Sequence, residues 1–307
     1  MKPPRREIAS SGHLLGQLIG DWWERYVIKP LLDDVAGQLD LFADSRFVQR
    51  SCRGEKIQWE DSTGNAVDYD FVLELGGTHQ KRGTPVAFME SFWRRGARHS
   101  KDKARDDTNK LLPMLDTYPT ARFAAIAACG EFTEPARDYV RSRNVNLFFV
   151  PKSNIISAFS EFGLQIDYLD SAAEDEKRII AQALQDQFTD EICQAVAAKL
   201  KDVVGHSSFA SFSHLVMSSL SAHPQEITIR EAAISDPVKF KTVQEASDFL
   251  EKPSFITSSK DSSYSYSIVY SDGSEFSRHL GSIEKLKSLH NDLLDLVTHM
   301  DNVTRRA

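Results

Sequence analysis

Two acidic residues in neighbouring apolar stretches are the part of this sequence best suited to chemistry. Asp70 lies in the stretch 67–75 and Glu90 in the stretch 85–93. Because side chains alternate along a β-strand, Asp68 and Asp70 would share one face of the first stretch. Glu90 has apolar neighbours, among which an unpaired carboxylate is costly. A divalent metal ion held by Asp70 and Glu90, with Asp68 as a further ligand, would remove that cost and would suit phosphodiester cleavage.

Each of these carboxylates also has a simpler structural interpretation. Asp70 could accept hydrogen bonds at a strand end, and Asp68 could be solvated charge. Glu74, on the same face, would be either a third ligand or an exposed residue. Glu90 could form a buried ion pair with an arginine, but such a pair is often no more stable than an apolar substitute. The metal interpretation is therefore favoured for Asp70 and Glu90.

The densest group of basic side chains follows directly after the second apolar stretch. The chain as a whole carries a formal net charge of -7, so a local basic cluster beside the acids is notable. It predicts a surface that follows the phosphates of a nucleic acid. The alternative is a solvated helix start. The cluster consists of Arg94, Arg95, Arg98, His99, Lys101, Lys103 and Arg105.

The length of the chain limits the number of its domains, and its cysteines indicate its cellular setting. The 307 residues are enough for one large domain or two modest ones. Cys52, Cys129 and Cys193 have neither metal-site nor disulfide spacing, which predicts a reduced, cytoplasmic setting. The beginning of the chain lacks the pattern of a signal peptide, and no apolar run is long enough to span a bilayer. We therefore expect no membrane partner.

The elements around the acids follow from the spacing of apolar side chains. Helical spacing over 11–39, with a kink expected at Pro30, precedes two strands joined by a glycine-rich hairpin. The strand, helix, strand order that comes later is typical of a parallel crossover. The fold class is therefore α/β, with a mixed sheet flanked by helices. The expected elements are strands over 67–75 and 85–93, a helix over 101–112, a strand over 122–129, a helix over 133–143 and a strand over 146–150.

The second half of the chain predicts a smaller α+β region. A charge run over 174–178 marks the expected boundary, which divides the chain into domains 1–172 and 173–307. One long helix is expected from there to residue 204. Alternating tyrosines before Asp272-Gly273 predict a β-hairpin, and a final helix begins near Ser282. This region would recognise DNA, dimerise or bind a partner.

Taken together, these features resemble the PD-(D/E)XK nuclease superfamily, the fold of many restriction endonucleases and repair nucleases. Its core is a helix, a three-stranded antiparallel meander, a helix and a strand. The resemblance implies that Asp70 is the motif's aspartate and Glu90 its second acid. Glu24, in the sequence GDWWE over 20–24, is similar to the glutamate that the first helix of this family often carries. The resemblance implies a restriction-endonuclease-like sheet.

One position departs from the family pattern. The motif has a lysine two residues after its second acid, and this chain has Phe92 there. Arg94 lies further along the same strand face. His99, Lys101 and Lys103 begin the next helix, from which some family members supply the lysine. Arg94 and Lys101 are therefore candidates for the catalytic cation, with His99 and Lys103 as further possibilities.

The resemblance implies a function and leaves alternatives open. It implies a DNA endonuclease of restriction or phage-defence type that uses Mg²⁺ or Mn²⁺ and leaves 5′-phosphate and 3′-hydroxyl ends. It would act as a homodimer or with a partner subunit of a defence complex. Phe92 supports an alternative, a catalytically inactive scaffold that binds DNA or a protein in a defence or repair complex. A nuclease directed at RNA is a third hypothesis.

Overall fold

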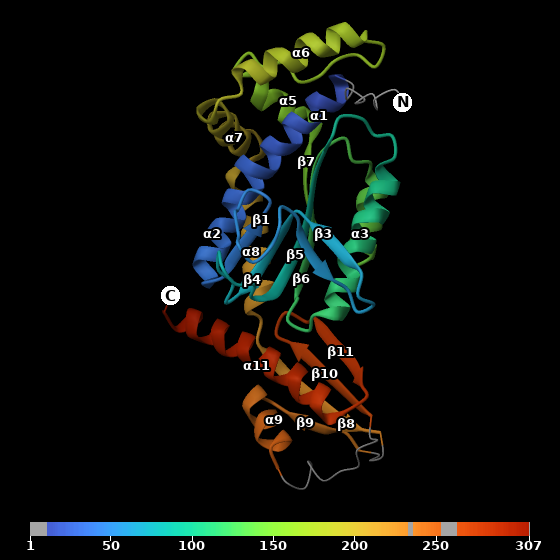
Figure 1. The fold of residues 1–307 in the computed structure, drawn as a ribbon, viewed down its shortest axis with the longest axis vertical. Helices are drawn as coiled ribbons and strands as arrows, with labels where there is room; N and C mark the ends of the chain where they lie inside the picture. Colours follow the sequence, from blue (N-terminus) through green and yellow to red (C-terminus); the bar gives the residue numbers. More distant parts are fainter. Residues whose placement is uncertain (1–10, 233–235, 253–262, 307) are drawn as a thin grey trace, which may run out of the picture.

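A five-stranded mixed sheet forms the centre of the N-terminal part of the molecule (Figure 1). The computed structural model describes residues 11–232, 236–252 and 263–306. In spatial order the strands are β1 (Phe42–Ser45), β4 (Phe71–Leu75), β5 (Thr84–Arg94), β6 (Phe123–Gly130) and β7 (Asn146–Pro151). β1, β4 and β5 pair antiparallel, whereas β5, β6 and β7 pair parallel. The prediction of an α/β fold with a mixed sheet is confirmed.

Helices cover both faces of this sheet. On one face lie α1 (Ser11–Trp22), η1 (Trp23–Ile28), α2 (Lys29–Leu39) and α5 (Lys152–Ser160); on the other lie α3 (Ser100–Thr117) and α4 (Glu134–Ser142). Phe71 and Met89 join the first core, and Val72 and Phe88 join the second. Because side chains alternate along a strand, Glu90 shares the face of Phe88 and points toward α3.

The acidic stretch expected as one strand is divided in two. β2 (Ile57–Glu60) and β3 (Ala66–Tyr69) form a separate two-stranded ladder, and β4 begins only at Phe71. Asp70 lies at the break, and its Oδ2 accepts the backbone N–H of Ser91 at 2.7 Å. The carboxylate therefore satisfies a backbone donor where the strand pairing stops. The prediction that Asp68 and Asp70 share a face of one strand is wrong, because Asp68 belongs to the β2–β3 ladder, whereas Asp70 lies at the break between β3 and β4.

The first helical run contains a wider turn just before Pro30. The N–H of Lys29 bonds to the carbonyl of Glu24, five residues back, which defines the π-helical segment η1. Proline has no N–H, so the carbonyl four residues before Pro30 has no helical donor, and a local change of winding is the usual response. The expected kink therefore takes the form of a π-turn, and this turn carries Glu24.

The helices after residue 173 complete the first hydrophobic core. They are α6 (Glu174–Gln187), α7 (Asp190–Val204) and α8 (His206–Ser221), and Ile180, Leu200 and Val216 all belong to the cluster that packs on the sheet. The long helix expected up to residue 204 is two helices, because Thr189 caps α7 with its side chain. The core is continuous across the boundary expected at 173, and a second core begins at Ala222.

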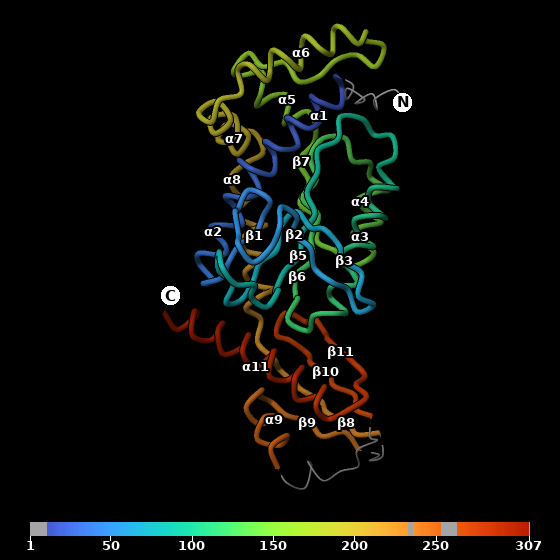
Figure 2. Tube along the Cα trace, in the orientation of Figure 1, coloured from blue at the N-terminus to red at the C-terminus, as the bar shows by residue number. Residues whose placement is uncertain are grey.

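The second core is built on a four-stranded antiparallel sheet, seen in the lower part of Figure 2. Its strand order is β11 (Glu275–Leu280), β10 (Tyr264–Tyr270), β8 (Pro224–Glu231) and β9 (Val238–Phe240), and α9 (Val243–Leu250) and α11 (Ile283–Arg306) cover it. The predicted hairpin is confirmed as β10 and β11, with Gly273 at a φ of 81° in the turn. None of the helices within the described residues is both long and apolar enough to cross a membrane.

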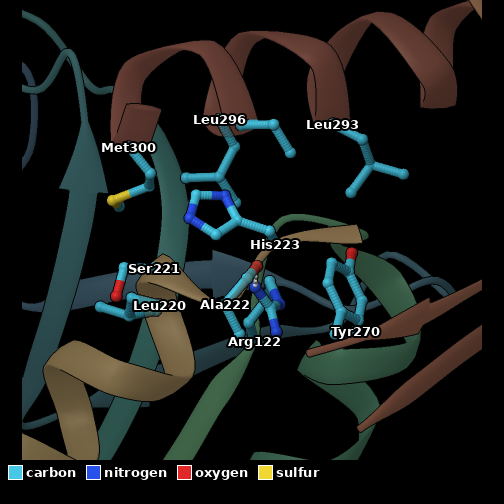
Figure 3. Close-up of a pocket in the computed structure, with 10 residues that line it drawn as sticks. Arg122, Leu220, Ser221, Ala222, His223, Tyr270, Leu293, Leu296 and Met300 are labelled. Atoms are coloured by element: carbon cyan, nitrogen blue, oxygen red, sulfur yellow. Dashed lines mark hydrogen bonds between the residues drawn. The ribbon is translucent and has the colours of Figure 1, made fainter. Parts of the chain in front are cut away.

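Arg122 connects the two cores (Figure 3). Its guanidinium carbon lies 3.5 Å from the centroid of the Tyr270 ring, and its Nη1 donates to the carbonyl of Ala222 at 2.7 Å. In Figure 3, Leu296 and Met300 of α11 lie above Arg122 and Ala222, and all four residues line the same pocket. Both of these α11 residues belong to the first core, so the last helix spans the two cores. The C-terminal unit is thereby held against the edge of the central sheet.

A buried arginine stabilises the free edge of the central sheet. The side chain of Arg50 is fully buried, and its Nη1 lies 2.7 Å from Asp44 Oδ2 of β1 and 2.5 Å from Glu74 Oε1 of β4. Glu74 also accepts the N–H of Gly83 at 2.7 Å. Glu74 is therefore a structural ion-pair partner, and neither of the roles considered for it, a third metal ligand or an exposed residue, describes it.

We predict that Arg50→Met lowers the free energy of unfolding by about 3–5 kcal/mol, because it leaves the buried Glu74 without its cation and Asp44 with Arg53 alone. Urea unfolding monitored by circular dichroism measures this change. Arg105→Met is the matched control, since Arg105 is 58% exposed and makes surface pairs only; it should shift stability by no more than about 0.5 kcal/mol. Equal effects of the two substitutions would contradict the prediction.

Candidate active site at the β4–β5 hairpin

Asp70 and Glu90 adjoin the last pair of the hairpin. Phe71 and Met89 form that pair, and the antiparallel register places Asp70 and Glu90, the next residue on each side, opposite one another. Directly opposed residues of an antiparallel pair point to the same face, with Cβ atoms about 4.5–5.5 Å apart. The charge of Asp70 also acts on Glu90, where it raises the pKa. The structure thus brings the two acids that the sequence singles out close enough for the charge of one to act on the other.

Glu90 is buried and only partly neutralised. It is 2% exposed, its Oε2 accepts from Lys110 Nζ at 2.7 Å, and its Oε1 accepts no hydrogen bond from the described residues. Burial, followed by the charge of Asp70, raises the pKa of Glu90 to about 8. Burial also raises the pKa of Asp70. The ion pair considered for Glu90 exists, with a lysine in place of the arginine, and one carboxylate oxygen remains available for a ligand.

Helix α3 supplies two lysines to this site. Lys103, Asp107 and Lys110 follow each other at helical spacing, so they share one face of the helix. Lys103 Nζ lies 2.7 Å from Asp107 Oδ1 and 5.1 Å from the centroid of the Phe92 ring. Burial acts to lower the pKa of Lys103, but the charges of Asp107, Glu90 and Asp70 raise it overall. Lys103 is therefore held as a cation beside both acids.

Phe92 packs in the core beside the ammonium of Lys103. The ring is 7% exposed and packs edge-on against Phe132, with the centroids 5.2 Å apart. It occupies the strand position that a motif lysine would take, and the ammonium of Lys103 lies over it as a cation–π contact. A cation is therefore present next to the position where the motif expects one, although it comes from the helix.

Glu24 approaches the site from the opposite helical layer. It is 8% exposed, and its Oε2 accepts from Arg46 Nε at 2.8 Å. Arg46 also pairs with Asp21 at 2.5 Å. Burial, followed by the charge of Asp70, raises the pKa of Glu24 to about 8. Glu24 is therefore an electrostatic neighbour of Asp70, and Arg46 partly balances the acids from that side.

Three of the predicted site residues lie outside this arrangement. Asp68 sits on β3 and pairs with Lys56 at 2.5 Å, so it does not share the strand face of Asp70 as expected. Arg94 donates to the carbonyl of Arg98 at 2.8 Å and is not paired with either acid. The side chain of Lys101 is exposed at the start of α3. The cation nearest in role to the motif lysine is therefore Lys103 or Lys110.

Most of the predicted phosphate-following cluster is on the surface and engaged in ion pairs. Arg95 pairs with Asp167 and Asp170, and His99 and Arg105 both pair with Asp102. These are exposed or half-exposed pairs, which contribute little to stability and can open for another anion. Arg98 and Lys101 are exposed beside them. The cluster is thus a surface group partly engaged by nearby acids, and Lys103 is its member that enters the site.

Sequence reasoning missed Lys110, Asp107 and Arg46. A signal existed for the first two, because residues 103, 107 and 110 fall on the same face of the predicted helix as the apolar Ala104 and Leu111. A lysine or aspartate on such a face is either paired or functional. Arg46 had no local signal, since it reaches Glu24 from a loop 22 residues away.

The donor set fits Mg²⁺. Within the described residues, no group of three histidine, cysteine or acidic side chains is arranged to hold a metal ion. Mg²⁺ does not need such a group, because it keeps several waters and is commonly bound by one or two carboxylates together with substrate phosphate oxygens. Asp70 and Glu90, with the unpartnered Oε1 of Glu90, provide those two carboxylates.

We predict that the metal-free protein loses stability as the pH rises from about 4.5 to 8. Glu90 ionises at its ordinary value of 4.5 when unfolded but near 8 when folded, so the folded state holds the extra proton across this window. For this single group the loss approaches at most about 1.4 kcal/mol per pH unit. Glu90→Gln should flatten the slope in chelator, as measured by urea unfolding from pH 5 to 8. Glu55→Gln, at an exposed position, should leave it unchanged; an unchanged slope in Glu90→Gln would contradict the assignment.

Comparisons with known proteins add no assignment to this geometry. Neither a family model nor a curated protein nor a solved structure matches the chain. The site consists of Asp70 at the start of β4, Glu90 on β5, two lysines of α3, and Glu24 with Arg46.

Proposed function

We propose that this protein is a Mg²⁺-dependent DNA endonuclease with a PD-(D/E)XK-like core. The observation that carries the proposal is the opposed pair Asp70 and Glu90, with one buried carboxylate oxygen unpartnered and lysines supplied by the next helix. The order of elements also supports it. A helix over 11–39, the antiparallel strands β1, β4 and β5, helix α3 and the parallel strand β6 follow the order that the resemblance implies.

The residues of the chain divide the work of phosphodiester hydrolysis. Asp70 and Glu90 hold the metal, and the N–H of Ser91 fixes the orientation of Asp70. When bound, Mg²⁺ supplies a water of lowered pKa and neutralises charge on the phosphate. Lys103 donates to the attacking water or to a phosphate oxygen, because its ammonium is the cation held between Asp107 and the ring of Phe92.

Asp107 and Glu24 lie behind these residues and affect the position and charge of the site. Asp107 holds Lys103 in place across one turn of α3. Glu24, held by Arg46, adds negative potential near Asp70 and so favours a divalent cation over a single proton or lysine. This group is typical of a site that must bind positive charge while it presents one cation to an anionic substrate.

Duplex DNA is the substrate that the surroundings favour. The basic rim of Arg98, Lys101 and their neighbours provides phosphate contacts beside the acids. One active site per chain cuts one strand, so cleavage of both strands needs a second copy of the chain or a partner subunit. The C-terminal unit, held in place through Arg122 and α11, is available for recognition of DNA or of that partner.

A catalytically inactive scaffold of the same fold is the second candidate. Two observations favour it: Phe92 stands at the lysine position, and Lys110 already neutralises Glu90. Such a protein would bind DNA or a protein partner without cutting. The two candidates differ in a single measurable property, metal-dependent cleavage.

We predict that Asp70→Asn and Glu90→Gln each reduce cleavage by at least about 100-fold, because each removes a metal ligand. Nicking and linearisation of plasmid DNA in Mg²⁺ or Mn²⁺ measure the effect, with RNA of the same sequence tested in parallel. Asp106→Asn, an exposed acid on α3, is the matched control and should cleave normally. Binding of DNA without cleavage by the wild-type protein in either metal would support the scaffold instead, and cleavage of RNA alone would redirect the substrate assignment.

We predict that Lys103→Met reduces kcat by about 100-fold or more while metal affinity changes little, because Lys103 stabilises charge in the transition state and does not contact Glu90. Arg94→Met and Lys101→Met should reduce kcat less than about threefold, in line with surface positions. Single-turnover cleavage at saturating metal separates these effects. A larger loss in Lys101→Met than in Lys103→Met would reverse the assignment.

A further inference from the structure

We propose that Lys110 is a place-holder for the divalent ion. Its ammonium pairs with the carboxylate of Glu90 in the metal-free protein and is displaced from it when the metal binds. This inference rests on the proposed metal site. It assigns the two lysines of α3 to different tasks. Lys103 stays in place and acts on the substrate, whereas Lys110 exchanges with the metal.

The contact between Lys110 and Glu90 is the first part of the argument. Lys110 Nζ lies 2.7 Å from Glu90 Oε2, on a carboxylate that is 2% exposed. Two opposed carboxylates repel one another unless a cation lies between them or one takes up a proton. In the metal-free protein Lys110 is the cation in hydrogen-bonding contact with Glu90. A Mg²⁺ ion on the unpartnered Oε1 of the same carboxylate would lie about 2.0–2.1 Å from that oxygen and would place two further positive charges next to the ammonium, which repels it.

The environment of Lys110 allows it to leave. Its side chain is 35% exposed, so the ammonium can move into water without crossing the core. The ring of Tyr69, 5.8 Å from Nζ, lies on the side toward β3. Asp68, the preceding residue of the same strand, is a half-exposed acid that pairs with Lys56, and the charge of Lys110 acts to lower its pKa. An acidic position therefore exists outside the site for the displaced ammonium.

Lys103 lacks this freedom. It is held at 2.7 Å by the buried Asp107 and lies over the buried ring of Phe92. Its hydrogen bond goes to Asp107 and not to Glu90. Metal binding at Asp70 and Glu90 therefore leaves the contacts of Lys103 intact but breaks the contact of Lys110.

The place-holder role predicts opposite effects for two substitutions. Lys110→Met removes both the competing cation and its repulsion of the metal, so metal affinity should rise. Lys110→Arg keeps the charge and offers a planar fork that can grip both oxygens of Glu90, so metal affinity should fall. If Lys110 only held Glu90 in position, Lys110→Met would bind the metal more weakly. If Lys110 were a catalytic residue, Lys110→Met would bind the metal as wild type does but would lose cleavage.

The experiment titrates Mn²⁺ and Mg²⁺ alone into chelator-treated full-length protein by calorimetry, with metal-induced shifts in Tm as a second readout. We expect the Kd of Lys110→Met to be about tenfold lower than that of wild type, a change of about 1.4 kcal/mol. The Kd of Lys110→Arg should be several-fold higher. Lys239→Met, an exposed lysine of β9 outside the site, should bind like wild type. If Lys110→Met does not fold, the charge-conserving variant Lys110→Arg tests the proposal by itself. A metal Kd of Lys110→Arg equal to or below that of wild type overturns the proposal.

The outcomes separate this inference from the proposed function. Weaker or unchanged metal binding by Lys110→Met overturns the place-holder role and leaves the nuclease proposal standing. Tighter binding by Lys110→Met, lost in the double variant with Glu90→Gln, supports it even if the protein cuts no nucleic acid. Cleavage by Lys110→Met at saturating metal should remain within about threefold of wild type, and its loss would assign Lys110 a catalytic role instead. Absence of metal binding in every variant overturns the proposal.

Discussion

The cost of holding the charge of Glu90 inside an apolar sheet governs the arrangement around it. An isolated carboxylate in such a place is unfavourable by many kcal/mol unless it is neutralised by a proton or a cation. The protein brings a second acid, Asp70, to the opposed position of the hairpin, which increases that cost. Lysines from α3 offset part of it. The site is therefore a place where a divalent cation would be stabilised by the fold itself.

Three features of the backbone make this arrangement possible. The antiparallel register of β4 and β5 aligns the two acids, and the end of strand pairing at Asp70 frees its carboxylate to accept the N–H of Ser91. Helix α3 then crosses the same face of the sheet, so residues four and three apart direct Lys103, Asp107 and Lys110 toward the acids. Register, strand break and helical spacing each follow from short-range rules, but the site needs all three together.

The parts of this arrangement that are local in sequence are the parts that could be predicted. The apolar run over 85–93 gives β5, and the alternating tyrosines before Asp272-Gly273 give the C-terminal hairpin. The break at Asp70 was not predictable from alternation, since Val67 to Leu75 continues the pattern without interruption. Its cause is the pairing of β3 with β2 in place of the central sheet.

Contacts between residues that are distant in the sequence could not be predicted, for a different reason. Strand β1 has four residues and no clear pattern, and its pairing with β4 depends on Arg50, which joins Asp44 to Glu74. Similarly, Arg46 reaches Glu24 from a loop. The boundary expected at 173 rested on a charge run, but charge on the exposed side of a helix says nothing about its buried side, and α6 to α8 pack on the first core. Long-range ion pairs and helix docking are set by tertiary packing, which a single sequence does not display.

Packing favours a phenylalanine at position 92 and a lysine at position 103. A lysine at position 92 would have to reach the acids from a strand whose face is covered by α3, α4 and the ring of Phe132. A phenylalanine there fills the apolar space at no electrostatic cost and presents its ring to a cation. Lys103, coming from the helix above, buries its stem along that ring and is held at its tip by Asp107. The pair of Phe92 and Lys103 thus separates two tasks that a single motif lysine performs together, filling the core and placing a charge. Because the second task now belongs to α3, the position of this helix relative to β5 becomes the quantity on which the proposed chemistry depends.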